Sequence, residues 1–136
     1  MIKLNINTDG GSRGNPGPGA IGVVINNEND KPIYEMGKTI GYCTNNEAEY
    51  TALIEALIKA KDFKATHLTM RLDSELVVKQ LNGQYKVKND RILVLWKKAK
   101  ELASGFAVIS FVHVPREKNK EADKLVNDAL DAEIIK

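Results

Sequence analysis

The chain opens with an alternation of apolar and polar residues, the pattern of a half-buried β-strand. Ile2, Leu4 and Ile6 are apolar and the residues between them are polar, up to Thr8 and Asp9. We therefore expect a first strand that ends at this Thr-Asp pair.

Two further strands are expected after a glycine-rich loop over residues 10–19. The segment Ala20–Asn26 is almost continuously apolar, which predicts a central strand. A polar turn, Asn27–Asp30, leads to a third strand near Pro32–Gly41. A turn this short predicts that the second and third strands pair antiparallel.

From Asn46 the apolar residues recur with a period of 3.6, which predicts a helix to about Ala60. The remaining pattern alternates between strand and helix periods, and the resulting order βββαβααβα predicts an α/β fold with a mixed sheet. The later elements expected are a strand at Leu68–Leu72, helices at Ser74–Leu81 and Asp90–Ala103, a strand at Phe106–Val114 and a helix at Glu121–Ala132.

Composition narrows the class of protein. The 136 residues, 43% hydrophobic and 28% charged, suit one globular domain over 1–136. A single cysteine, Cys43, excludes an internally disulfide-bonded scaffold. No apolar run approaches the roughly 20 residues that span a bilayer, and the first residues do not resemble a signal peptide. We expect a cytoplasmic protein with no membrane partner.

Charge is unevenly distributed although the net charge is only +2. Between Lys79 and Lys100 there are seven basic residues and one acid, Asp90. Such an excess suits a polyanion such as a nucleic acid backbone. A solvated helix face with an adjoining loop explains the same run without a ligand.

Four carboxylates occupy positions where a charge is costly unless it is paired or bound to a cation. Asp9 and Asp73 follow strands, and Glu49 and Asp123 border the apolar faces of helices. Each alone is explained as a cap or as a favourable charge near a helix N-terminus. Together they form one cluster if both helices pack over adjacent strand ends. Oxygen ligands suit Mg²⁺ or Mn²⁺, and two such ions about 4 Å apart support phosphodiester cleavage.

Four segments that carry these acids resemble the motifs of type 1 ribonuclease H, in family order. Thr8–Gly19 reads Thr-Asp-Gly-Gly-Ser-Arg-Gly-Asn-Pro-Gly-Pro-Gly, like the opening motif of that family. Thr44–Glu49 resembles the second motif and Leu72–Ser74 the third. His113–Asp123 is similar to the fourth, in the form found in archaeal and some bacterial members.

The resemblance implies a ribonuclease H-like fold: a five-stranded mixed sheet, three antiparallel strands and then two parallel ones, flanked by helices. It implies a monomeric endonuclease that uses two Mg²⁺ ions, or Mn²⁺, to hydrolyse the RNA strand of RNA–DNA hybrids. In the archaeal-like branch, double-stranded RNA is a further candidate substrate. The metal ligands that it implies are Asp9, Glu49, Asp73 and Asp123.

Glu47 competes with Glu49 for the second ligand position. Glu49 stands three residues after Asn46, as the family's metal-binding Glu does after its second Asn. Glu49 also shares a helical face with Leu53, whereas Glu47 points about 200° around the helix from Glu49. Glu47 is better interpreted as a first-turn acid that the helix dipole favours.

The resemblance also implies substrate contacts. Asn15 and Thr44 would meet a phosphate of the DNA strand. Because the basic protrusion of some members has no counterpart here, hybrid binding would rest on the loop Asn82–Asn89 with Lys86 and Lys88. The residues expected near RNA 2′-hydroxyls are Gly11, Ser12, Asn45 and Glu75.

Two residues compete for an auxiliary catalytic role. Arg116 matches an arginine of the archaeal-like branch, and its planar guanidinium suits the scissile phosphate. His113 stands ten residues before Asp123, the spacing of the loop histidine in many bacterial members. The alternation around His113 places it inside a strand, where a histidine is more often structural. Trp96 lies on an apolar helical face and is expected in the core.

Two other function classes remain open at this point. A non-catalytic module that binds hybrids would be favoured by a missing acid, and none is missing. Integrases, transposases and structure-specific DNA nucleases share the architecture. They typically carry three acids and lack the Gly-Asn-Pro-Gly-Pro-Gly loop.

Overall fold

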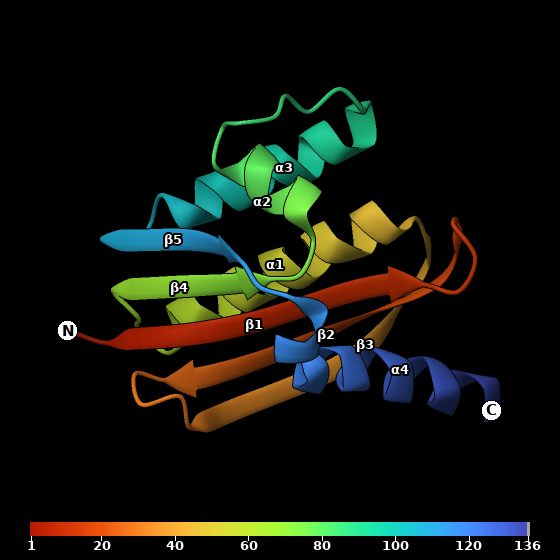
Figure 1. Cartoon of the computed structure of the whole chain (residues 1–136), viewed down its shortest axis with the longest axis horizontal. Helices are drawn as coiled ribbons and strands as arrows, with labels where there is room; N and C mark the ends of the chain where they lie inside the picture. Colours follow the sequence, from red (N-terminus) through yellow and green to blue (C-terminus); the bar gives the residue numbers. More distant parts are fainter. Residues whose placement is uncertain (136) are drawn as a thin grey trace.

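A computed structural model describes residues 1–135 and shows a single five-stranded sheet with helices on both faces (Figure 1). The elements are β1 (Lys3–Ser12), β2 (Gly17–Asn27), β3 (Pro32–Cys43), α1 (Asn45–Asp62), β4 (His67–Leu72), α2 (Glu75–Leu81), α3 (Asp90–Ala103), β5 (Val108–His113), a short 3₁₀ turn (Arg116–Lys118) and α4 (Lys120–Ile135).

The strand order in the sheet is β3-β2-β1-β4-β5. β1 pairs antiparallel with β2, and β2 with β3, whereas β1, β4 and β5 run parallel. This confirms the expected mixed sheet.

The β1–β2 hairpin is longer than the sequence predicted. Pairing continues from Asp9 opposite Gly22 to Ser12 opposite Gly19, and the Arg13 amide donates to the Pro18 carbonyl at 2.9 Å. The expectation that Asp9 follows the strand, and that residues 10–19 are all loop, was therefore wrong. Glycine lowers strand propensity, but here its backbone groups join the hydrogen-bond ladder of a sheet buried on both faces.

One face of the sheet carries the main core. Ile6, Val23 and Met70 pack under α1, whose Leu53 and Leu57 are fully buried. α3 packs against α1, and this explains why α3 has an apolar face. Trp96 packs against this core as predicted, and its indole donates to the Gln80 carbonyl at 3.1 Å.

α4 packs on the opposite face, over β1, β2 and β3 (Figure 1). Its close approach depends on Gly22, because a Cβ there would lie 2.3 Å from the Ala122 carbonyl oxygen. Ala20 on β2 and Val126 and Leu130 on α4 form a second buried cluster. Within the part of the chain that the structure describes, no helix has the length and apolar character to cross a membrane.

Candidate active site

Three carboxylates from three elements meet at one end of the sheet. Asp9 is on β1, Glu49 on α1 and Asp73 directly after β4. The parallel register pairs Thr8 with Leu72, so the residues that follow, Asp9 and Asp73, lie side by side. One oxygen from each of the three acids lies within 4.8 Å of the others.

Glu49 reaches this cluster because α1 passes very close to β1. A Cβ on Gly10 would lie 2.3 Å from the backbone carbonyl of Ala48, so only glycine permits this packing. The start of α1 is fixed by a capping box, in which Thr44 accepts from the Glu47 amide and the Glu47 carboxylate accepts from the Thr44 amide. Glu47 is thus the first-turn acid that the sequence indicated, and Glu49 faces the cluster.

Asp123 and Arg116 reach the same place from the segment after β5. Asp123 lies in the first turn of α4, and the Arg116 guanidinium is 3.7 Å from its carboxylate. Together with Asp9 and Asp73 they line a groove of about 370 Å³, which we call the carboxylate groove. All four predicted acids and Arg116 are therefore in one region.

The carboxylates strongly perturb one another. Burial, and next the negative charge of Asp73, raise the pKa of Asp9 to about 7. Burial together with the charges of Asp9 and Asp73 also raises the pKa of Glu49 well above its ordinary value. The cluster therefore holds more negative charge than a protein tolerates without a proton or a cation.

A divalent cation fits this cluster. Glu49 is only 7% exposed, and one of its oxygens accepts from the Gly10 amide at 3.4 Å. The other oxygen is buried and has no hydrogen-bond partner among the described residues. The possible metal ligands in the cluster are all carboxylate oxygens, the ligands that Mg²⁺ and Mn²⁺ prefer. A bound cation would satisfy the unpartnered oxygen and neutralise the cluster.

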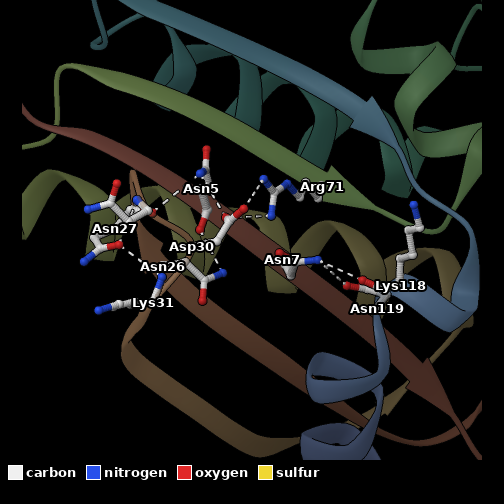
Figure 2. A network of polar contacts seen from close by, with 10 residues as sticks. Asn5, Asn7, Asn26, Asn27, Asp30, Lys31, Arg71, Lys118 and Asn119 are labelled. Carbon is white, nitrogen blue, oxygen red and sulfur yellow. Dashed lines mark hydrogen bonds and ion pairs between the residues drawn. The ribbon is translucent and has the colours of Figure 1, made fainter.

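Asn119 positions this arrangement and was missed by the sequence analysis. It is fully buried at the start of α4, next to Asn7 of β1 (Figure 2), and its side-chain amide donates to the Thr8 carbonyl at 2.9 Å. Its side-chain oxygen accepts from Asn7 at 3.1 Å, and its backbone carbonyl accepts from the Asp123 amide at 3.0 Å. Asn119 thus connects the residue before Asp9 with the helical turn that carries Asp123. The preference of Asn for helix N-caps was a usable signal.

A second group of polar contacts in Figure 2 lies farther along the sheet. Asp30, in the β2–β3 turn, accepts from Arg71 at 3.0 Å and from Asn5 at 3.0 Å. These interactions, led by the hydrogen bond from Arg71, lower the pKa of Asp30. They hold the turn against β1 and β4, and none of these three residues lines the carboxylate groove.

The residues expected to touch the substrate form a connected chain beside the carboxylate groove. The Asn45 side-chain oxygen accepts from the Ser12 amide at 2.8 Å, and the Asn45 amide donates to the Asn15 side chain at 3.0 Å. Gly11 and Ser12 line the carboxylate groove. A second hollow, of about 650 Å³, is lined by Asn15, Thr44, Asn45, Asn46, Glu47, Asn89, Arg91 and Ile92. Asn89 and Arg91 were not predicted for this site.

The other predicted contacts lie apart from both hollows. Glu75 is the first residue of α2 and forms an ion pair with Lys79 at 2.6 Å, which lowers the pKa of Glu75. It is not among the residues that line either hollow. Lys86 and Lys88 are exposed in the loop between α2 and α3. Part of the basic run is structural, because Lys100 donates to the Leu81 carbonyl at 3.1 Å at the end of α2.

His113 and Arg116 differ in their relation to the carboxylate groove. His113 is the last residue of β5, where it is exposed and paired in register with Leu72. Its predicted strand location is confirmed, but it does not line the groove, and Arg116 does. Geometry therefore favours Arg116 as the residue that meets a group bound at the carboxylates.

Comparison with known proteins bears on the same residues. The reverse transcriptase-like family model matches residues 7–129, a span that holds all four acids. A ribonuclease HI from Halobacterium salinarum is 47% identical over 123 residues, covering 90% of this chain and 62% of the relative. The chain belongs to the ribonuclease H family. Its sheet order is the one that the family resemblance implied.

Solved structures agree with this assignment. The RNase H1 of the same halophile superposes with a TM-score of 0.93 at 45% identity, covering 96% of this chain and 98% of that one. The N-terminal RNase H domain of Rv2228c from Mycobacterium tuberculosis gives a TM-score of 0.94 at 44% identity, covering 97% and 96%. LC11-RNase H1, solved in complex with an RNA/DNA hybrid, gives a TM-score of 0.92 at 43% identity, covering 96% of this chain and 99% of that one.

The length match differs between relatives. The whole mycobacterial protein, described as bifunctional, is 45% identical over 132 residues, which cover 96% of this chain but 36% of that relative. The chain thus spans 36% of the mycobacterial relative and 62% of the halophile one.

Proposed function

We propose that this protein is an endonuclease that hydrolyses the RNA strand of RNA–DNA hybrids, with two Mg²⁺ ions held by Asp9, Glu49, Asp73 and Asp123. The observation that carries the proposal is the convergence of three carboxylates within 4.8 Å, two of which line a groove together with Asp123 and Arg116. The unpartnered Glu49 oxygen supports a cation at this position. Mn²⁺ is expected to substitute, since it takes the same oxygen ligands.

When bound, such a pair of ions activates a water molecule and stabilises the leaving oxygen of a phosphodiester. The protein supplies the placement. β1 and β4 fix Asp9 and Asp73, and the contact between Gly10 and α1 fixes Glu49. Arg116 is exposed and only 3.7 Å from Asp123, so its planar fork of donors can reach a phosphate oxygen bound at the groove.

The two hollows suit the two strands of a duplex. The RNA strand would lie in the carboxylate groove, where Gly11 allows close backbone approach and Ser12 and Asn45 supply short polar groups for 2′-hydroxyls. The DNA strand would place a phosphate at Asn15 and Thr44 in the second hollow. That LC11-RNase H1 was crystallised with an RNA/DNA hybrid supports this substrate class.

Three finer expectations belong to the same proposal. Double-stranded RNA is a secondary substrate, because it shares the A-like geometry and 2′-hydroxyls of the hybrid. Glu75, Lys86 and Lys88 contact the duplex outside the two hollows. The protein acts as a monomer in the cytoplasm.

The deciding experiment is cleavage of an end-labelled RNA–DNA hybrid, with and without Mg²⁺, beside matched double-stranded RNA and double-stranded DNA. We expect metal-dependent cuts in the RNA strand of the hybrid, slower cuts in double-stranded RNA and none in DNA. Asp73→Asn is the matched inactive control. Mn²⁺ in place of Mg²⁺ tests the choice of metal.

Binding without cleavage would overturn the catalytic proposal. A protein that binds the hybrid but leaves it intact with either metal would be a non-catalytic reader of A-like duplexes. Cleavage of DNA alone would instead favour the integrase-like class that shares this fold. An EDTA control shows whether cutting needs a divalent metal, and Asp73→Asn shows whether it comes from this site.

A further inference from the structure

The carboxylate groove continues beyond the four acids toward a second guanidinium. Its lining extends along the end of β1 and one side of α4 to Arg13, Asn127 and Leu130. Among the residues that line it, Arg13 and Arg116 are the ones that carry positive charge. Nothing in the proposed reaction uses Arg13.

Each of the two arginines forms an ion pair with an aspartate of α4. Arg116 pairs with Asp123, and Arg13 pairs with Asp131 at 2.5 Å. Asp123 and Asp131 are eight residues apart on α4, a separation of about 12 Å along a helix. The groove therefore has a guanidinium associated with each of two positions on α4, one beside the carboxylates and one remote from them.

The backbone of Arg13 is fixed while its side chain is only lightly held. The Arg13 amide donates to the Pro18 carbonyl at 2.9 Å, and its carbonyl lies against Gly17, where a Cβ would clash at 2.0 Å. The side chains of Arg13 and Asp131 are 38% and 61% exposed. Exposed ion pairs contribute little to stability, so this one is a weak structural element and easily exchanged.

We propose that Arg13 is a substrate-binding residue that holds a phosphate of the RNA strand remote from the one that is cut. In the free protein the Arg13 guanidinium is paired with Asp131, and the phosphate takes the place of the Asp131 carboxylate when the strand enters the groove. A guanidinium binds phosphate through two parallel hydrogen bonds, which also orients the strand. This inference rests on the proposed function, because it assumes that the groove receives the RNA strand.

Two variants with opposite expected effects test the proposal by steady-state cleavage of the hybrid. Arg13→Gln should raise KM about tenfold, the effect of losing one charge-assisted contact, and leave kcat within about twofold. It should also lower the slope of log KM against log salt by about one, as for one lost phosphate contact. Asp131→Asn frees the guanidinium and should lower KM.

Matched variants control for net charge and for folding. Lys38→Gln removes a positive charge from the exposed Lys38–Glu55 pair, and Asp128→Asn removes a negative charge from the Lys124–Asp128 pair of α4. Neither residue lines the carboxylate groove, so KM should stay within about twofold. Thermal melting of every variant shows that it is folded.

The outcomes separate this inference from the proposed function. If the wild type does not cleave the hybrid, the proposed function fails. If the wild type cleaves but Arg13→Gln leaves KM and its salt slope unchanged, or if Arg13→Gln and Asp131→Asn shift KM in the same direction, the role of Arg13 is overturned. Neutral methylphosphonate linkages, placed one at a time along the RNA strand, provide a second test. At one position remote from the cleavage point, the neutral linkage should weaken hybrid binding by the wild type but not by Arg13→Gln.

Discussion

Gly10 and Ala48 touch through their backbones, and this contact places Glu49 beside Asp9. A Cβ on Gly10 would lie 2.3 Å from both the carbonyl carbon and the carbonyl oxygen of Ala48. The distance between two of the four acids is therefore set by a residue that has no side chain.

Gly10→Ala should consequently push α1 away from β1. We expect a loss of about 1–3 kcal/mol in the free energy of unfolding, the usual cost of overpacking, and a loss of activity near 10²-fold from misplacement of Glu49. Urea unfolding and hybrid cleavage measure the two effects. Gly11→Ala is the control for stability, because its Cβ would meet only the Asn45 side chain at 3.8 Å. Equal stability of the two variants would contradict this account.

The carboxylate cluster should make the metal-free protein less stable as pH rises. The pKa of Asp9 is about 7 in the folded protein, whereas its ordinary value, which applies to the unfolded chain, is 3.8. Between pH 3.8 and about pH 7, the folded state therefore holds a proton on Asp9 that the unfolded state has released. Stability contributed by this group is therefore present at low pH and lost as pH rises through about 7. Urea unfolding in EDTA at pH 5 to 8 measures it, and Mg²⁺ should restore stability at pH 8.

Asp9→Asn should separate the effect of charge repulsion on stability from the effect of Asp9 on cleavage. At pH 8 without metal the variant should be more stable than the wild type, by an amount on the order of 2 kcal/mol, because one buried negative charge is removed. Cleavage should be abolished, since one expected metal ligand is lost. The difference in stability between variant and wild type should shrink toward pH 5. A variant less stable than the wild type at pH 8 in EDTA would contradict the charge repulsion.

Asn119 should affect both stability and metal binding. Asn119→Ala removes the side-chain donor to the Thr8 carbonyl and one of the two acceptors of the Asn7 side-chain amide, at a cost of about 1–3 kcal/mol. Because it also loosens the turn that carries Asp123, the variant should need more Mg²⁺ for half-maximal thermal stabilisation. The control is Asn5→Ala, which breaks the Asn5–Asp30 contact of Figure 2 away from the groove. Similar Mg²⁺ requirements for the two variants would make Asn119 structural only.

Arg116 and His113 are distinguished by their effects on turnover. Arg116→Ala should lower kcat about 10²-fold and change KM less, because the guanidinium is expected to act on the scissile phosphate in the transition state. His113→Ala should change kcat little, since His113 does not line the groove. Steady-state kinetics of both variants on one hybrid decide between them. An unchanged rate in Arg116→Ala would reject its assignment.

Lys86 and Lys88 should contribute to binding through charge alone. Each substitution by Ala should lower the salt slope of hybrid affinity by up to about one, with no preference for sequence. Fluorescence anisotropy of a labelled hybrid over a range of salt concentrations measures this. Lys38→Ala is the control, because Lys38 lies on β3 and pairs with Glu55. A slope near zero in the wild type would reject electrostatic binding.

The sequence alone determined the order and type of the elements and the identity of the four acids. Periods of 2 and 3.6 are local properties, and so the strands and helices could be assigned from them. The structure of the Gly10–Gly19 segment could not be assigned from such a period. Its backbone groups pair across the β1–β2 hairpin although the local residues have low strand propensity. Family resemblance carried the choice of Asp9, Glu49, Asp73 and Asp123 as one set.

The tertiary structure decided how these residues meet. The register between β1 and β4, the backbone contact of Gly10 with Ala48 and the buried Asn119 bring together groups that are 38 to 111 residues apart in sequence. The same packing placed Arg13 on the carboxylate groove and left Glu75 off it. Sequence patterns record which face of an element is buried, but the distance between two faces depends on close packing of the whole chain.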